Sequence, residues 1–486
     1  MIIEVIALSL LLLAGVALLG ALGFSGWMLI PLSFVVGICF YVSINYLQSL
    51  AGLSSSPLIT FGIIFGISTV LFTYIIVTRG YKITFNIAVA TILSIIGLLA
   101  VITVIREANL VEYHYDSIRY LIVGSLIESN NLDWISRNLL TKRYSSVAIL
   151  HAPANLAGEF YLRSLHPLVG LSTLGVLFWF SYEGLRLAMP LKEALAFALI
   201  GTLLLMTNSG FAWHSFYING HLLVAAFLLV VVGTGWLAAS DSGSRRELLC
   251  LQAVGVAGLV LSRPEGALIA PLALLPTLLW GKIPLSSRWA ILAVFGSAVI
   301  VQQGFIMLTT ASLGQSVRMR AWLLFGVGLG ALLALPVLAW SFVTRHSKYV
   351  LAAVEGLLWI ALIGFSLARP ALLQQSVDAT LRNVVFDAGE WGASLMILAA
   401  LVIGAILLTD APQRIFLRFP LTACIPMFLL FAFLRGKPYR VGATDSLNRM
   451  LIHLVPLAIL FVISAAASKR WGVANWQREE RSHPSS

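Results

Sequence analysis

One acidic residue stands at the start of an apolar-periodic stretch in the most polar part of the sequence. Asp116 and Ser117 come directly before the periodic stretch 118–127, so one of them is expected to N-cap a short helix. A helix of this kind lies along a membrane surface. If the substrate is a lipid-linked phosphate, the reaction needs a general base at the membrane surface, and a carboxylate on this helix would be held there. The alternative is that Asp116 only caps the helix and that Arg119 anchors it to lipid headgroups.

A second polar segment, 213–221, is rich in aromatic residues and has no lysine or arginine. Its histidines, His214 and His221, are seven residues apart, so one face of a helix would present both. With Asp116 or Glu112 they would form a ligand set for a divalent metal, which the sequence leaves open. Aromatic faces with a few hydrogen-bonding groups also suit sugar rings. An aromatic belt at the membrane interface explains the same Trp and Tyr residues equally well.

The elements that position these residues belong to a membrane protein. Hydrophobic residues make up 59% of the chain and charged residues only 10%, whereas soluble domains carry about 25% charged residues. Apolar runs of about 20 residues recur along the chain, long enough to cross a bilayer of about 30 Å. They lack the alternation of barrel strands. The sequence therefore predicts an all-α polytopic membrane protein.

The apolar runs predict about thirteen transmembrane helices and one short helical hairpin. The segment 248–280 is apolar but is interrupted at 262–266, so we expect either a pair of short helices or a re-entrant hairpin there. The predicted spans are 2–22, 27–47, 57–78, 83–105, 168–183, 190–207, 220–239, 289–310, 321–344, 349–368, 392–409, 416–434 and 449–467.

Basic residues predict the orientation of these helices. Sixteen of the 31 Lys and Arg residues lie in alternate short connections or in the tail, which places those segments in the cytoplasm. The formal charge of +11 is explained in the same way, and no nucleic-acid partner is expected. The N-terminus is then outside and the C-terminus cytoplasmic, in a plasma (inner) membrane.

This topology divides the chain into four parts. We expect four N-terminal transmembrane helices (1–105), a large external loop with an interfacial helix (106–167), a helix bundle (168–468) and a basic cytoplasmic tail (469–486). The external side would carry the long polar segments, and function tends to lie in such loops. These segments are 106–167, 208–219, 369–391 and 435–448.

Three short segments resemble one family of membrane enzymes. The run Asp-Ser-Ile-Arg-Tyr at 116–120 resembles the Asp-Glu-x-Arg-Tyr signature in the first large external loop of GT-C glycosyltransferases. That superfold includes the lipid A aminoarabinose transferases and their protein mannosyltransferase relatives. The run Ser-Arg-Pro-Glu-Gly at 262–266 resembles a recurring turn of its bacterial members, and 445–449 is similar to their late Arg-containing segment. Ser117 replaces the second acid of the signature, and four spans precede the loop where the family usually has one.

The resemblance implies a GT-C-like fold with its site in the external loops. It implies an enzyme that moves a sugar from a polyprenyl-phosphate donor to a cell-surface glycan, lipid or protein acceptor on the outer face. Asp116 would be the catalytic base. No metal ligand or cofactor is assigned. Cations for the donor phosphate would be Arg263, Arg449, Arg440 and Lys437, and substrate-binding candidates are Arg119, Tyr120, His114, His214, Tyr217 and His221.

Other interpretations remain open. Each basic candidate, taken singly, is also explained as a helix-end residue that snorkels to the headgroups. A polymerase of the O-antigen type would use the same kind of lipid-linked glycan. A lipid-linked oligosaccharide flippase or transporter would need charged residues within its spans, and Glu355 is the one acid clearly inside a predicted span.

Overall fold

The computed structural model of the chain describes residues 1–79, 81–111, 115–129, 145–240, 245–311, 330, 340–407 and 415–467. Every regular element in these residues is a helix. In the first half they are α1 (Ile2–Leu22), α2 (Leu29–Leu50), α3 (Pro57–Thr78), α4 (Tyr81–Ala108), α5 (Tyr115–Glu128), α7 (Ser146–His151), η2 (Ala152–Ala157), α8 (Leu165–Arg186), α9 (Leu191–Met206), α10 (Ser209–Phe216) and α11 (His221–Ser240). In the second half they are α12 (Arg245–Ser262), α13 (Gly266–Leu279), α14 (Leu285–Ala311), α16 (Trp340–Arg345), α17 (Ser347–Ala368), α18 (Pro370–Val384), α19 (Ser394–Leu407), α20 (Ile415–Arg435) and α21 (Ser446–Leu451), before a last apolar helix, Val455–Ala467.

Eight described helices are long and apolar enough to cross a membrane. They are α1, α2, α3, α4, α8, α11, α14 and α17, and the bent pair α9–α10 would make a ninth. The chain is therefore a multi-pass membrane protein by the length and composition of its helices. The predicted number of about thirteen spans is not confirmed, because α19, the part Ile415–Phe431 of α20 and the last helix are shorter apolar helices. The predicted span 321–344 lies almost wholly outside the described residues.

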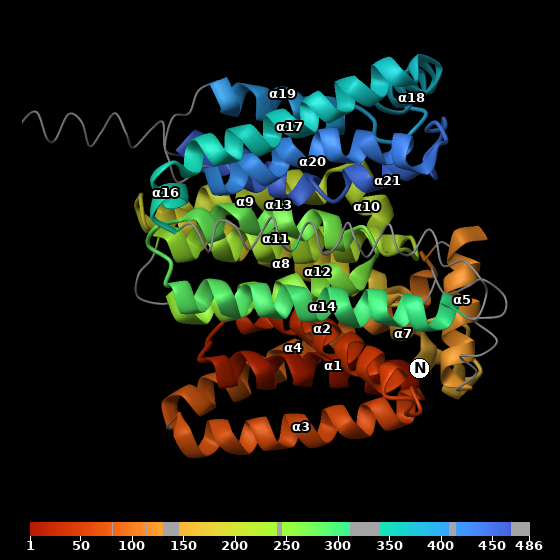
Figure 1. The fold of residues 1–486 in the computed structure, drawn as a ribbon. Coiled ribbons are helices and arrows are strands. Elements are labelled where there is room, and N and C mark those ends of the chain that lie inside the picture. The colour runs from red at the N-terminus through yellow and green to blue at the C-terminus, as the bar shows by residue number, and fades with distance from the viewer. Residues whose placement is uncertain are drawn as a thin grey trace, which may run out of the picture.

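The long helices lie side by side in a bundle (Figure 1). At its centre is α11, which packs against α8, α12, α13 and α20 and is buried along its whole hydrophobic length. The helices α1 to α4 form one flank of the bundle, and α17 to α20 form the opposite flank (Figure 1). A helix that is apolar on all sides, as α11 is, suits such a central position.

The crossing of α1 and α2 is unusually close. A Cβ atom on Gly15 would lie 1.7 Å from the carbonyl oxygen of Ser33, and one on Gly37 would lie 1.7 Å from that of Leu11. Only glycine permits this backbone contact, and small residues are the usual means of bringing helices together in lipid. The pair α1–α2 is thus a tight unit within the flank.

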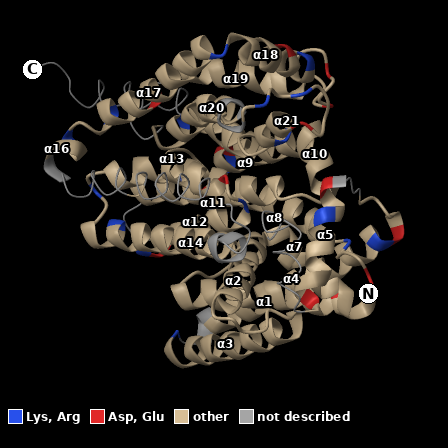
Figure 2. Ribbon diagram, turned by 45° about the vertical axis from the view of Figure 1, so that its right-hand side comes forward, with Lys and Arg blue, Asp and Glu red and all other residues tan. Residues whose placement is uncertain are grey.

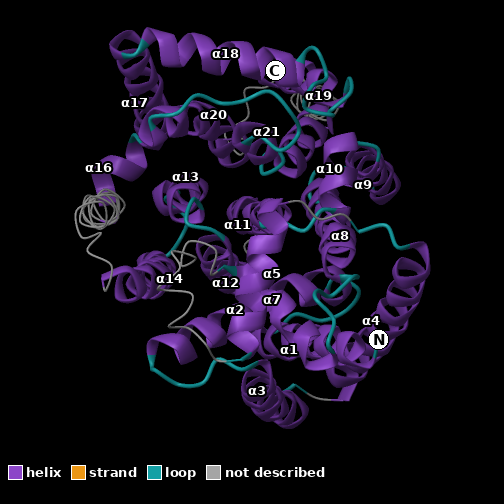
Figure 3. Cartoon of the chain, turned by 90° about the vertical axis from the view of Figure 1, so that its right-hand side faces the viewer, coloured by secondary structure: helices purple, strands orange, loops and turns teal. Residues whose placement is uncertain are grey.

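Charged side chains gather towards the two ends of the bundle and leave the middle of most helices uncharged (Figure 2). One end, called here the α5 end, holds the N-terminus together with α5, α7, α10, α18 and α21 (Figures 1 and 2). Described parts of all four predicted polar segments are found at this end. Figure 3 looks along the bundle and shows α18 lengthwise, so this helix lies across the long helices.

A cluster of charges ties the N-terminal flank to the first loop at the α5 end. The Arg106 side chain donates from Nε to Glu4 at 2.5 Å and from Nη2 to Glu159 at 2.6 Å. The other oxygen of Glu4 accepts from the backbone N–H of Ser164 at 2.6 Å. We call Glu4, Arg106 and Glu159 the Arg106 clamp. Because Glu4 is only 1% exposed, the clamp pairs and hydrogen-bonds a charge that would otherwise be costly to bury.

The segment 248–280 forms the helix pair α12–α13, one of the two predicted alternatives. The local course of the chain differs from the prediction at two places. The span predicted at 449–467 is divided, since α21 ends at Leu451 and a turn precedes the last helix. The helix α5 begins at Tyr115, so Asp116 lies in its first turn and does not precede it as a cap.

Candidate functional site

Asp116 meets the late arginine of the chain at the α5 end. Its Oδ2 lies 3.2 Å from Nη1 of Arg449, and the two side chains are 30% and 12% exposed. The same Nη1 donates to the Tyr217 hydroxyl at 3.4 Å. Burial raises the pKa of the Tyr217 phenol, which therefore stays neutral next to the carboxylate. One carboxylate, one guanidinium and one phenol from three distant segments form the centre of the candidate site.

The position of Arg449 is set by the first turn of α21. Asp445 caps this helix, because its side chain accepts from the backbone N–H groups of Leu447 at 2.9 Å and Arg440 at 3.0 Å. Next to Arg449, the Asn448 amide oxygen accepts from the Trp391 indole at 2.6 Å. Two polar side chains that precede Arg449 in the chain, Asp445 and Asn448, are thus fixed by hydrogen bonds.

A second arginine lies at the turn between α12 and α13. Arg263 makes a forked ion pair with Glu265, with N–O distances of 3.2 and 3.1 Å, and it donates to the Tyr120 hydroxyl at 3.3 Å. Partial burial raises the pKa of Glu265, but the charge of Arg263 outweighs this effect and lowers the pKa to about 2. Arg263 also lies against the start of α11, where a Cβ on Gly220 would be 3.1 Å from its side chain.

The two arginines belong to one site because residues of the same helix, α5, contact both of them. Asp116 of α5 reaches Arg449, and Tyr120, one turn further along, reaches Arg263. Between them, the buried Ser117 hydroxyl donates to the carbonyl of Ile218 at 2.8 Å. This bond fixes α5 against the connection between α10 and α11.

Buried imidazoles line the inner side of this connection. His221 Nδ1 and His453 Nε2 are 2.9 Å apart and share a hydrogen bond, and His214 Nδ1 lies 3.1 Å from the Asn219 amide nitrogen. The backbone N–H of Asn219 lies 3.1 Å from Nε2 of His166. Within the described residues, no three His, Cys, Asp or Glu side chains are arranged to hold a metal ion. His166 and His214 thus both hydrogen-bond with Asn219, in the polar turn that carries Tyr217.

The other predicted site residues that the structure describes lie on α5 and on the segment before α21. Arg119 is on α5 and half-buried, while the side chains of Lys437 and Arg440 are exposed. The described contacts of Arg440 are made by its backbone, to Asp445 and Asn383. His114 lies outside the described residues.

Two residues at the site received no role from the sequence. Glu265 belongs to the motif at 262–266 and accompanies Arg263. His453 follows Arg449 by four residues, a spacing that places two side chains on the same side of a helical turn. That spacing was the signal by which His453 could have been found.

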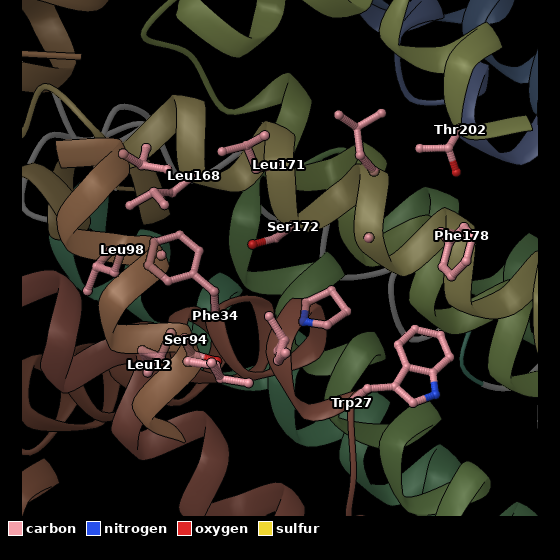
Figure 4. A pocket seen from close by; sticks show the side chains of 17 residues that line it. Leu12, Trp27, Phe34, Ser94, Leu98, Leu168, Leu171, Ser172, Phe178 and Thr202 are labelled. Carbon is pink, nitrogen blue, oxygen red and sulfur yellow. The ribbon is translucent and has the colours of Figure 1, made fainter. Parts of the chain in front are cut away.

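An apolar groove leads along the bundle to the site. One cavity of about 480 Å³ is lined by residues of α1, α2, α4, α8 and α9, among them Phe34, Leu98 and Phe178 (Figure 4). A second cavity of about 480 Å³ shares Leu171 and two other lining residues with it and reaches Ser215. Ser215 is two residues from Tyr217 in the chain, so the second cavity borders α10, the helix that leads to the polar cluster.

Glu355, the acid inside a predicted span, has a cationic neighbour. Its carboxylate lies 3.5 Å from Nη2 of Arg418 on α20, and the two side chains are 19% and 37% exposed. A nearby opposite charge is the usual way for a carboxylate to be tolerated within a span.

The chain was compared with family models, curated proteins and solved structures, and none of them matches it.

Proposed function

We propose that the protein is a glycosyltransferase of the GT-C type that uses a polyprenyl-phosphate sugar donor at the α5 end. The observation that carries the proposal is the ion pair of Asp116 with Arg449, which also donates to the Tyr217 hydroxyl, while Arg263 donates to Tyr120 one turn further along α5. A carboxylate beside two arginines combines a proton acceptor with cations suited to a phosphate. The resemblance at 116–120, 262–266 and 445–449 involves the segments that carry these residues.

In the proposed reaction, an acceptor hydroxyl attacks the anomeric carbon of the donor sugar. The new bond joins the hydroxyl oxygen to that carbon, and the bond from the carbon to the phosphate oxygen breaks. The hydroxyl proton passes to Asp116. The leaving polyprenyl phosphate keeps the electron pair of the broken bond, and the guanidinium groups of Arg263 and Arg449 stabilise its charge.

The present pairing of Asp116 with Arg449 fits this scheme as a resting state. A donor phosphate would attract the Arg449 guanidinium, because arginine binds phosphate through paired hydrogen bonds. The carboxylate would then lose its cationic neighbour and become a better base. Arg263 would keep its fixed position because Glu265 holds two of its nitrogens.

The apolar groove supports a lipid-linked substrate. It provides an apolar path from the middle of the bundle to the polar cluster, as an amphipathic donor with a long isoprenoid chain requires. Such a donor would place its chain in the groove and its phosphate at the arginines.

The same proposal includes the topology. The shorter apolar helices α19, α20 and Val455–Ala467 would also span the bilayer, with α12–α13 as the predicted hairpin. Together with the predicted span 321–344, this gives about thirteen spans in a GT-C-like arrangement. The α5 end would face outwards from the plasma membrane. The basic connections at the other end would then be cytoplasmic, as the distribution of Lys and Arg favours.

The test is a transfer assay with purified protein. Polyprenyl-phosphate donors carrying radiolabelled sugars are incubated with a membrane-glycan extract, and Asp116→Asn is compared with Glu355→Gln. We expect transfer by the wild type and by Glu355→Gln and loss of transfer in Asp116→Asn. Ordinary turnover in Asp116→Asn would exclude it as the base. No transfer by the wild type with any donor, while donor binding persists, would favour the flippase interpretation and Glu355.

A further inference from the structure

The helix α18 has the surroundings of a helix that lies on a membrane. It begins directly after α17, runs across the α5 end and is seen lengthwise in the view along the bundle (Figure 3). Its residues divide into three stripes at helical spacing. One stripe faces the protein and consists of the buried residues Ser376, Ala379 and Asn383.

The second stripe is apolar and only partly covered by the protein. Leu373, at one end of this stripe, packs against Leu362 of α17 and Leu430 of α20, which belong to the apolar part of the bundle. Further along the same stripe, Val377 is 45% exposed and Leu381 is 50% exposed. The stripe therefore turns towards the hydrocarbon level of the long helices.

The third stripe is polar and lies on the other side of the helix. Asp378 and Arg382 form an ion pair of 3.0 Å there, with side chains 58% and 59% exposed. A helix with one protein-facing, one apolar and one solvated side is suited to the boundary between lipid and water.

Exposed cations lie where α18 begins. Arg369 and Lys437 mark the points at which α17 and α20 end, and both side chains are exposed. A Cβ on Gly436 would be 3.9 Å from the Arg369 guanidinium, so the two basic residues are neighbours. No ion pair within the described residues engages either of them. Basic side chains at this level attract anionic lipid headgroups.

The protein-facing stripe connects α18 to the segment before α21. The Ser376 hydroxyl accepts from the Tyr439 N–H at 3.3 Å. The Asn383 side chain accepts from the Gly442 N–H at 2.7 Å and donates to the Arg440 carbonyl at 2.9 Å. Contacts of α18 with its surroundings therefore act on the backbone that leads to the candidate site.

From this arrangement we propose that α18 docks on the bilayer surface and that Arg369 and Lys437 bind the headgroups of anionic lipids. Val377 and Leu381 enter the acyl-chain boundary, and the two cations contact phosphate groups of the same leaflet. The proposal does not depend on the reaction proposed above, since it rests on the exposed stripes and charges of α18 alone.

The apolar stripe is tested with a fluorescent probe in the full-length protein. An NBD group is attached at Leu381→Cys or, as the control on the polar stripe, at Asp378→Cys, both in a Cys250→Ala background because Cys39 and Cys424 are buried. In nanodiscs with doxyl-labelled phosphatidylcholine, we expect quenching about twofold or more stronger at position 381 than at 378. Equal quenching, or a probe at 381 shielded from both lipid and water by another protein copy, would overturn the proposal.

The cations are tested by the lipid dependence of thermal unfolding. Nanodiscs of phosphatidylcholine alone are compared with nanodiscs that also contain phosphatidylglycerol. We expect phosphatidylglycerol to raise the unfolding temperature of the wild type and of the control Arg382→Gln, and to have little effect on the Arg369→Gln/Lys437→Gln double variant. An equal rise in all three proteins would show that anionic lipid acts elsewhere.

Discussion

Two clusters of charge at the same end of the molecule differ in how their members are held. In the Arg106 clamp the contacts are 2.5–2.8 Å long, and both oxygens of Glu4 are used. Around Arg449 the contacts to Asp116 and Tyr217 are 3.2 and 3.4 Å. The clamp is closed by short hydrogen bonds and suits a structural role. The Arg449 cluster is more loosely held, and a ligand could rearrange it.

The largest effect expected from this difference is on catalysis. Asp116→Asn removes the proposed base but keeps the size of the side chain, so transfer should fall by about 10²–10⁴-fold. Its unfolding temperature should stay close to that of the wild type, because the lost contact is long and partly exposed. Radiolabel transfer and thermal unfolding measured on the same preparation test both statements. If Asp116→Asn were inactive only because it is unfolded, the Arg449 cluster would be a structural element like the clamp, and the expected difference between the two clusters would be wrong.

The complementary change is Arg106→Gln in the clamp. It leaves the buried Glu4 without its cation, and removing one partner of a buried ion pair costs about 3–5 kcal/mol. Thermal or denaturant unfolding in detergent measures the loss. The matched control is Arg186→Gln, which breaks the exposed pair with Glu183 and should cost about 0–1 kcal/mol. Similar losses in the two variants would mean that the clamp is not a structural element.

A smaller effect is expected at Tyr217. Tyr217→Phe removes the hydroxyl that accepts from Arg449, and a hydrogen bond to a charged group contributes about 1.5–3 kcal/mol. Because this contact is long, we expect the lower end of that range, about tenfold in donor affinity. Titration with a non-hydrolysable polyprenyl phosphonate measures it. Unchanged affinity would place the phosphate away from Arg449.

The smallest effect is a pH dependence of the clamp. Partial burial opposes ionisation of Glu159, but its hydrogen bonds with Arg106 prevail, and its pKa is lowered. The stabilisation is therefore present above the unfolded value of about 4.3 and is lost as the pH falls through the folded pKa. The unfolding temperature should drop more steeply below that pH in the wild type than in Arg106→Gln. Parallel curves of unfolding temperature against pH for the two proteins would mean that ionised Glu159 does not stabilise the fold through Arg106.

The long apolar helices could be predicted from sequence to within a few residues. The predicted spans 57–78 and 349–368 correspond to Pro57–Thr78 and Ser347–Ala368, because uninterrupted apolar composition alone determines them. Breaks were harder to predict. The bend of 67° between α9 and α10 follows the cap made by Asn208, whose side chain accepts from the Phe211 N–H. A hydropathy profile does not detect a side-chain cap of this kind.

The candidate site could be predicted only in part. Asp116, Arg263 and Arg449 were selected from three short segments, and the structure shows which side chains contact them. The pairing of Asp116 with Arg449 joins residues 333 positions apart, and no periodicity within one helix can reveal such a contact. His453 was missed as a site residue because its partner His221 is 232 positions away, whereas Glu265 was missed although its partner Arg263 is only two residues away in the same motif.

The Arg106 clamp also has a consequence for biosynthesis. Arg106 follows Glu4 by 102 positions and Ser164 follows it by 160. The ribosome therefore delivers the carboxylate to the membrane well before either of its partners has been made. The tight α1–α2 hairpin can form at once, since its contacts are local, but its acidic end has no cationic partner until α4 arrives. Closure of the clamp is thus a marker for completed assembly of the first four helices.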